Sequence, residues 1–208
     1  MAYDTSKVCG KLLCPAEWDW DQNCVKDSIH NRMSECIISE NSWPLFLYKN
    51  YKVNHENLEE GLSKSKLLVQ AFKAIFTSPS SAKEAKGDEQ AKVKTCVASV
   101  INMKKVTPRT ITYVVCQVHF TLSNISSWCT VNGDFDYEGF WNNTVDFFED
   151  VPSPVMKHRI DRLLEWWTWK IFGINHCEDL TPDVVSQMSI NTLAGQRKVL
   201  EDAAFDLD

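Results

Sequence analysis

The hydrophobic pattern is most regular in the second half of the chain, where three stretches follow a hydroxyl–proline pair. The pairs are Thr107-Pro108, Ser153-Pro154 and Thr181-Pro182. The hydroxyl can accept a hydrogen bond from one of the first free N–H groups of a helix, and proline suits the first helical position. We therefore predict that a helix begins at each pair.

Apolar residues recur at helical spacing after the first two pairs and in a stretch between them. From Pro108 to about Ile125 the stripe contains Ile111, Val114, Val115, Val118, Leu122 and Ile125. Its β-branched content would also suit a strand, but the proline start and a length of about four turns favour a helix. We predict two further helices, over 137–149 and from Pro154 to Phe172. Gly173 would end the latter.

The first half is less regular. Residues 1–50 carry Trp18, Trp20 and Trp43 in polar sequence and predict irregular structure. A helix is expected from Ser63, as its cap, to Phe76. Residues 78–92 are rich in Ser, Lys, Ala and Glu, and predict a mobile polar loop.

These patterns predict a mainly α protein. We expect a compact single-domain helical bundle of roughly five or six helices with an irregular, Trp-containing N-terminal segment. The expected division is an N-terminal extension over 1–11, a helical domain over 12–175 that includes the polar loop, and a C-terminal helix with an acidic tail over 176–208. A chain of 208 residues is long enough to bury a core without disulfides.

Charge and composition narrow the functional classes. The net charge of −6 argues against general nucleic-acid binding and against a polybasic membrane anchor. The N-terminus lacks the pattern of a signal peptide, and no apolar run approaches the roughly 20 residues that span a bilayer. We therefore expect an intracellular protein, in cytoplasm or nucleus, with reduced cysteines.

The charge is unevenly distributed. Residues 83–109 hold seven basic and three acidic side chains, a local charge of +4. Such a run is usually a solvated loop, but it could contact an acidic partner or nucleic acid. The basic residues are Lys83, Lys86, Lys92, Lys94, Lys104, Lys105 and Arg109.

The densest aromatic run is Trp166-Trp167-Thr168-Trp169. Neighbouring helical residues point about 100° apart, so Trp166 and Trp167 cannot both lie at the centre of one face. If Trp167 is in the core, Trp166 or Trp169 turns outward. The outward ring would pack under another segment or anchor an interface.

Candidate catalytic and metal-binding motifs are weak. Cys9, Cys14, Cys24 and Cys36 lack the paired spacing of zinc ligands, although His30 lies among them. Cys116 and His119 lie three residues apart on the predicted helix. They fit either a nucleophile with its base or a packed cysteine beside a surface histidine.

The segment Asn132-Gly133-Asp134 is a turn signal. A calcium loop starting at Asp134 would need Glu at its twelfth position, where Val145 stands. Phosphate-binding glycine motifs are missing from the sequence. We therefore assign no catalytic, cofactor-binding or metal-binding residue.

Several short segments, taken in order, resemble an uncharacterised domain family of mushroom-forming (basidiomycete) fungi, catalogued as a domain of unknown function. The resemblance covers roughly residues 12–173 and implies no activity, cofactor or catalytic residue. In one motif, Trp167-Thr168-Trp169 stands where the family would have Trp-Trp-Asn. The segments are Leu12-Leu13-Cys14-Pro15 with Trp18, Trp43-Pro44-Leu45-Phe46-Leu47-Tyr48, Gly61-Leu62 with Leu67-Leu68-Val69, Ile75-Phe76-Thr77-Ser78-Pro79-Ser80-Ser81, Met103-Lys104-Lys105-Val106-Thr107-Pro108, Tyr113-Val114 through Gln117-Val118-His119-Phe120, Phe147-Phe148-Glu149-Asp150, and Leu163-Leu164-Glu165-Trp166-Trp167 with Ile171-Phe172-Gly173.

Three functional hypotheses follow. The first is a non-enzymatic protein-interaction module that uses an exposed aromatic patch at Trp166 or Trp169 and an unknown protein partner. The second is a nucleic-acid-associated protein, linked to mobile elements, that uses the basic stretch 83–109. The third is an enzyme of unrecognised type that depends on a cysteine.

Overall fold

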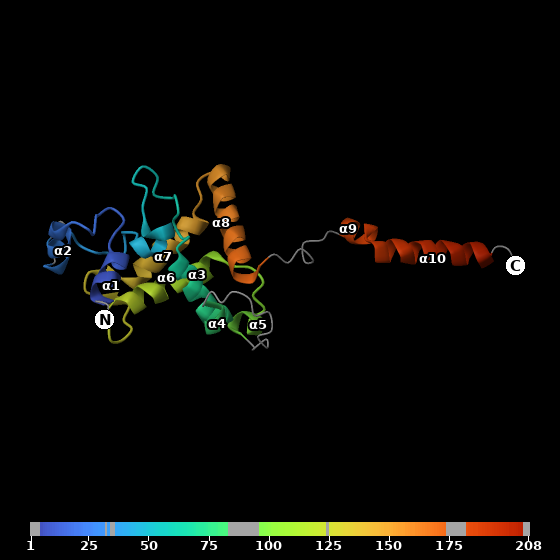
Figure 1. Ribbon diagram of the computed structural model, residues 1–208. Coiled ribbons are helices and arrows are strands. Elements are labelled where there is room, and N and C mark those ends of the chain that lie inside the picture. The colour runs from blue at the N-terminus through green and yellow to red at the C-terminus, as the bar shows by residue number, and fades with distance from the viewer. Residues whose placement is uncertain are drawn as a thin grey trace. The chain divides into compact units, whose positions relative to one another are not determined.

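The computed structural model describes residues 5–31, 33, 36–82, 96–123, 125–173 and 182–205, and these are mainly helical, as the sequence predicts (Figure 1). The chain divides into two compact units, residues 1–171 and 172–208. Among the described residues, none of the helices has the length and apolar character needed to cross a bilayer.

The centre of the first unit is α6, Pro108–Leu122. Its start at Pro108 is confirmed. The Thr107 hydroxyl accepts from the Thr110 N–H at 3.4 Å, and the Thr110 hydroxyl accepts from the Thr107 N–H at 3.0 Å. This reciprocal pair satisfies two N–H groups that a helix start leaves without partners. The predicted apolar stripe lies in the core, where Ile111, Val114 and Val115 are fully buried.

A short hairpin leads into α7. Strands β1 (Val131–Asn132) and β2 (Phe135–Asp136) pair antiparallel, with Val131 opposite Asp136. Gly133 turns the chain at φ +61, which confirms the predicted turn. Helix α7, Tyr137–Glu149, starts where the Asp136 carboxylate accepts the Glu138 N–H at 2.9 Å. It packs along α6, so the hairpin lies over one end of α6.

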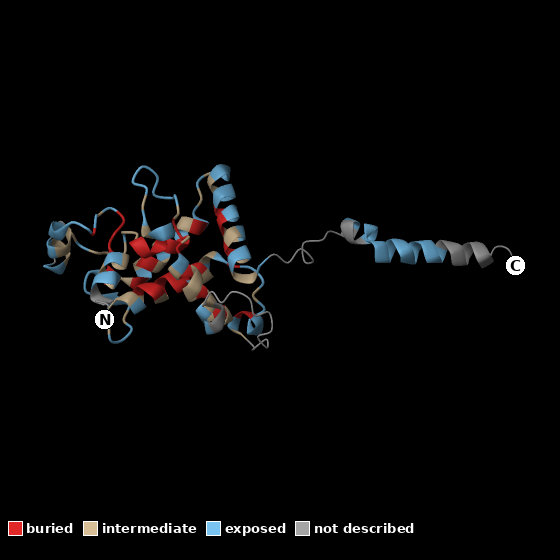
Figure 2. Cartoon of the chain, viewed as in Figure 1, coloured by how far each residue is buried: buried red, intermediate tan, exposed pale blue. Residues whose placement is uncertain are grey.

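Helix α8, Pro154–Phe172, matches its predicted bounds. The Ser153 hydroxyl accepts the Met156 N–H at 3.3 Å, and Gly173 ends the helix with φ +78. Only a narrow stripe of α8 is buried, and the rest is solvent-facing (Figure 2).

The predicted helix start at Ser63 is wrong by two residues. Ser63 has φ +58, which no helix accommodates, and α3 (Lys66–Phe72) is capped by Ser65, whose hydroxyl accepts the Leu68 N–H at 3.1 Å. The helix continues as a π-helical turn, η3 (Lys73–Thr77).

Two short helical segments follow η3. They are α4 (Pro79–Ala82), inside the region predicted as a loop, and α5 (Val97–Val100). The remainder of that predicted loop, 83–92, lies outside the described residues.

Part of the N-terminal region is helical, where the pattern predicts irregular structure. It contains α1 (Thr5–Leu13) and α2 (Asn23–His30), followed by the 3₁₀ turns η1 (Leu45–Leu47) and η2 (Lys49–Tyr51). Helix α1 has nine residues and α2 has eight, and α2 buries none of its side chains, so neither shows an apolar stripe long enough to recognise.

The second unit contains α9 (Pro182–Gln187) and α10 (Ser189–Phe205). The predicted start at Pro182 is confirmed, whereas Thr181 lies outside the described residues. The apolar pattern weakens after Gly195, yet α10 continues to Phe205.

Candidate functional site

Trp167 sets the rotation of α8 about its own axis. Its ring is fully buried and packs on Phe72 of α3 with ring centroids 5.6 Å apart. Its indole N–H donates to the Ser63 carbonyl at 2.9 Å. The left-handed backbone at Ser63 and the buried tryptophan therefore meet in one contact, and of the alternatives left open by the sequence, Trp167 is the core ring.

With Trp167 fixed, its neighbours are directed toward the surface. Trp166 is half-buried and lies perpendicular to Trp167, while Trp169 is 46% exposed. The Lys170 ammonium lies 4.4 Å from the Trp169 ring centroid and 5.8 Å from that of Trp166. The Lys64 ammonium approaches Trp166 from the other segment at 5.7 Å. We call Lys64, Trp166, Trp169 and Lys170 the tryptophan–lysine face.

Of the predicted basic residues, the structure describes Lys104, Lys105 and Arg109. Lys104 and Lys105 are exposed, and the next residue, Val106, donates its N–H to the Thr168 hydroxyl at 3.1 Å. This bond holds the segment against α8, within the same turn as Trp169. Arg109 instead pairs with Glu149 of α7 at 3.2 Å, and this carboxylate raises the pKa of Arg109. The other predicted basic residues, Lys83, Lys86, Lys92 and Lys94, lie outside the described residues.

A second candidate, missed at the sequence level, is built around His119. The prediction that this histidine lies on the helix surface is wrong, because it is 5% exposed. Its imidazole stacks on Phe135 of the hairpin, with centroids 4.0 Å apart and planes 12° apart, and meets the rings of Phe46 and Phe140. Its Nδ1 lies 2.9 Å from the Tyr137 hydroxyl.

One signal for this burial was present in the sequence. His119 stands four residues after Val115 and next to Val118, on the same apolar stripe of α6. The hairpin that covers it comes from residues more than ten positions later, and periodicity carries no information about such a contact.

Burial decides the charge of the His119 side chain. Desolvation lowers its pKa to about 3, so the imidazole is neutral at physiological pH. A group with so low a pKa is a weak general base, because efficient proton transfer needs a pKa near the working pH. The ring is therefore suited to hydrogen bonding and not to acid–base catalysis.

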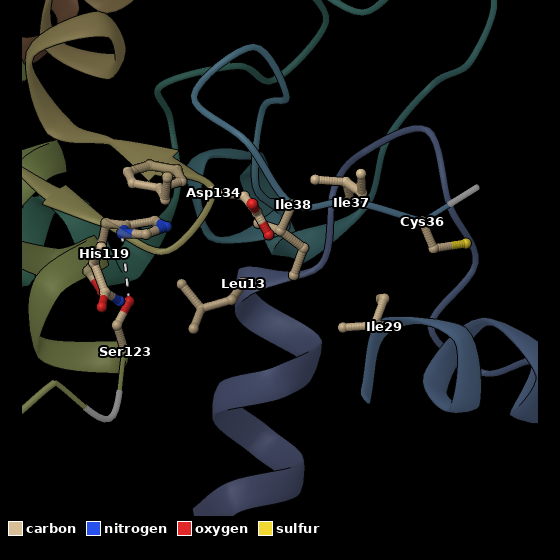
Figure 3. Close-up of a pocket in the computed structure, with 10 residues that line it drawn as sticks. Leu13, Ile29, Cys36, Ile37, Ile38, His119, Ser123 and Asp134 are labelled. Carbon is tan, nitrogen blue, oxygen red and sulfur yellow. Dashed lines mark hydrogen bonds between the residues drawn. The ribbon is translucent and has the colours of Figure 1, made fainter. Parts of the chain in front are cut away.

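His119 borders a small cavity of about 230 Å³ (Figure 3). One wall is aliphatic and comes from Leu13 of α1 and from Ile37 and Ile38. The lining also includes His119 and the exposed carboxylate of Asp134 in the hairpin turn. The cavity thus combines aliphatic side chains with hydrogen-bonding ones.

A larger groove of about 780 Å³ lies along α1 and α2. Its apolar surface comes from Val8, Leu12, Trp20 and Tyr51, and its rim carries lysines and aspartates of both signs. Although it is larger than the His119 cavity, its lining lacks a fully buried polar group that would orient a ligand.

The cysteines differ in environment. Burial raises the pKa of Cys14 and of Cys116 to about 12, so both remain neutral thiols. Burial and the raised pKa both argue against Cys116 as the nucleophile considered from its spacing to His119. Hydrogen bonds from Ser99 lower the pKa of Cys96 at the start of α5. Across the described ranges, no three His, Cys, Asp or Glu side chains are grouped in a way that could hold a metal ion.

Comparison with known proteins gives one match. Residues 5–172 match a family described as "Family of unknown function (DUF6698)". No curated protein and no solved structure matches the chain. The matched range includes α1 through α8, and so both candidate sites.

Proposed function

Since the chain belongs to the family of unknown function DUF6698, which supplies no activity to transfer, we propose a function from its own surface: it is a protein-interaction module whose tryptophan–lysine face binds an acidic segment of a partner protein. The observation that carries the proposal is the exposed Trp169 ring beneath the Lys170 ammonium, at 4.4 Å.

The geometry of the face supports a docking role. A tryptophan that is half exposed leaves apolar area in water, and such rings are common anchors at interfaces. Trp167 holds α8 in place from the core side, so Trp169 is presented on a rigid element. A rigid anchor loses less conformational entropy when a partner binds.

The charges of the face select the class of partner. Lys170 and Lys64 lie over tryptophan rings, where a cation–π contact holds an ammonium for about 0.5–1 kcal/mol at exposed sites. Such ammonium groups keep their charge and can meet carboxylates. Lys105, on the segment held to α8 through Val106 and Thr168, adds positive charge at the same end of the helix. The exposed carboxylate of Glu165 lies next to the face on α8 and partly offsets its positive charge.

Titration with a short peptide of alternating glutamate and phenylalanine, followed by fluorescence anisotropy of the labelled peptide, tests this proposal. Trp169→Ala should weaken binding at least tenfold, the usual effect of losing an interface anchor. Lys170→Glu should weaken it by a similar factor, because the substitution places like charges together.

Lys157→Glu is the matched control. It makes the same charge change on the same helix, at an exposed position about three turns from Trp169, and should leave binding unchanged. Failure of the wild-type protein to bind the peptide would overturn the proposal, as would equal losses in Lys157→Glu and Lys170→Glu.

A nucleic-acid-associated role is the second candidate. Tryptophans interleaved with lysines also suit stacking on single-stranded bases, although the net charge of −6 opposes it. A short oligothymidine strand in the same titration separates the two. Binding of oligothymidine without binding of the peptide would favour nucleic acid. The fungal distribution and intracellular location expected from the sequence remain predictions.

A further inference from the structure

The cavity beside His119 has the features of a small-ligand site independent of the tryptophan–lysine face. It opens between the end of α1, residues 36–38 and the hairpin turn, as Figure 3 shows. Its lining includes the aliphatic side chains of Leu13, Ile29, Ile37 and Ile38 and the polar side chains of His119, Ser123 and Asp134. Its volume of about 230 Å³ lies below the usual range for drug-sized ligands.

The buried imidazole directs one ring nitrogen to this cavity. The Ser123 hydroxyl donates to the His119 carbonyl at 2.8 Å, and Tyr137 places its hydroxyl 2.9 Å from Nδ1. When Tyr137 donates to Nδ1, the ring proton resides on Nε2. The described residues offer Nε2 no hydrogen-bond partner. The imidazole therefore has one ring nitrogen without a protein partner among the described residues, and a ligand in the cavity can reach it.

His119 Nε2 and the Asp134 carboxylate at the cavity are best matched by a ligand that both accepts and donates hydrogen bonds. In the tautomer in which Tyr137 donates to Nδ1, the neutral Nε2–H group donates and the Asp134 carboxylate accepts. An anion would be repelled by Asp134, and among the described lining residues no Lys or Arg offsets that charge. A hydroxyl group satisfies both partners at once, and a short branched hydrocarbon would fill the aliphatic wall.

We propose that the cavity binds a small aliphatic alcohol, with its hydroxyl between His119 Nε2 and the Asp134 carboxylate and its hydrocarbon end against Leu13, Ile37 and Ile38.

Isoamyl alcohol, isoamylamine and isovalerate form a matched set of probes, because they share one branched chain and differ in the polar end. Each is titrated into the full chain, and the NMR signals of the His119 ring and the Leu13 methyl groups are followed. The alcohol should shift both sets of signals in a saturable way. The amine should bind more weakly, and isovalerate should cause no saturable shift.

Asp134→Ala is the main variant, because Asp134 is exposed and its loss leaves the core intact. It should weaken alcohol binding about tenfold, since a site built around a hydroxyl loses one partner. Asp146→Ala removes an exposed carboxylate from α7 outside the cavity and should have no effect. Ile37→Trp fills the mouth of the cavity and should abolish binding.

Three results would overturn this inference. They are an alcohol titration that leaves the His119 signals unchanged, tighter binding of isovalerate or isoamylamine than of the alcohol, and equal affinities of wild type and Asp134→Ala. None of these bears on the tryptophan–lysine face, because none of its four residues lines the cavity.

Discussion

At both His119 and Trp169 a nitrogen group that can carry a proton lies against aromatic rings, but one site is buried and the other is exposed. At His119 this group is the imidazole itself, and its burial among Phe46, Phe135 and Phe140 removes its charge. At Trp169 the nitrogen group is the Lys170 ammonium, which lies over a ring that is about half exposed to solvent. The comparison shows that burial determines the charge of the nitrogen group beside the rings. The buried imidazole of His119 is neutral, whereas the ammonium beside Trp169 is accessible to a partner.

The largest expected effect breaks the buried side of α8. Trp167→Ala should lower the free energy of unfolding by about 3–5 kcal/mol, because it leaves a large cavity against Phe72 and removes the donor to Ser63. Trp169→Ala is the matched surface control, with an expected loss of about 0.5–1 kcal/mol from the cation–π contact. Urea unfolding followed by circular dichroism measures both, and equal losses would contradict the assigned orientation of α8.

The next effect concerns pH. The folded-state pKa of His119 is lowered to about 3 from an ordinary value of 6.5, so the unfolded chain binds the proton more readily. The stabilisation of the folded state that comes from keeping His119 neutral is fully present above about pH 6.5 and is lost as pH falls toward 3. Between pH 7 and pH 5 the loss is about 2 kcal/mol. In His119→Gln, which keeps a neutral polar group, the loss over this range should be smaller by that amount.

Two helix caps extend the comparison at lower energy. Ser65→Ala should cost about 2 kcal/mol and Thr107→Ala about 1 kcal/mol. Both hydroxyls accept a hydrogen bond from a helix N–H. Ser65 is fully buried, so in Ser65→Ala water cannot reach the Leu68 N–H to replace the lost bond, whereas at the exposed Thr107 water can. Thermal unfolding of the two variants checks the order, and a larger loss at Thr107 would contradict it.

The smallest effect is expected at a surface ion pair. Arg109→Ala removes the contact to Glu149 between α6 and α7, in which both side chains are largely solvated. Exposed ion pairs contribute little, and salt screens them further. The urea midpoint should therefore change little at low salt and be the same as wild type at high salt. A marked loss that persists at high salt would show that packing, and not charge, is involved.

The sequence predicts most accurately the helices whose signals are local. Helices α7 and α8 begin and end at the predicted residues, and α6 begins at Pro108 as predicted but ends at Leu122, about three residues before the expected end at Ile125. At α3 the same reasoning chose Ser63 as the cap in place of Ser65. The left-handed backbone at Ser63 rules it out as the cap, and nothing in the sequence around a serine indicates such a conformation.

The candidate sites were less predictable, since their key contacts join distant parts of the chain. The identity of Trp167 as the core ring followed from helical geometry only as one alternative, and the choice depends on Phe72 and Ser63. The cavity beside His119 needs α1 and the hairpin to meet over α6, which no local pattern encodes.

The π-helical turn η3 has a consequence for insertions and deletions. A π turn holds one residue more than the α turn it replaces, so η3 reads as a single-residue insertion in a helix that began at Lys66. Deleting the exposed Ala74 would remove that extra residue and let the helix continue as a regular α-helix, with the following residues keeping their direction about the helix axis. The rings of Phe72 and Phe76 would then be three positions apart in place of four, a spacing that still lies on one helix face, so we expect the turn to tolerate this deletion.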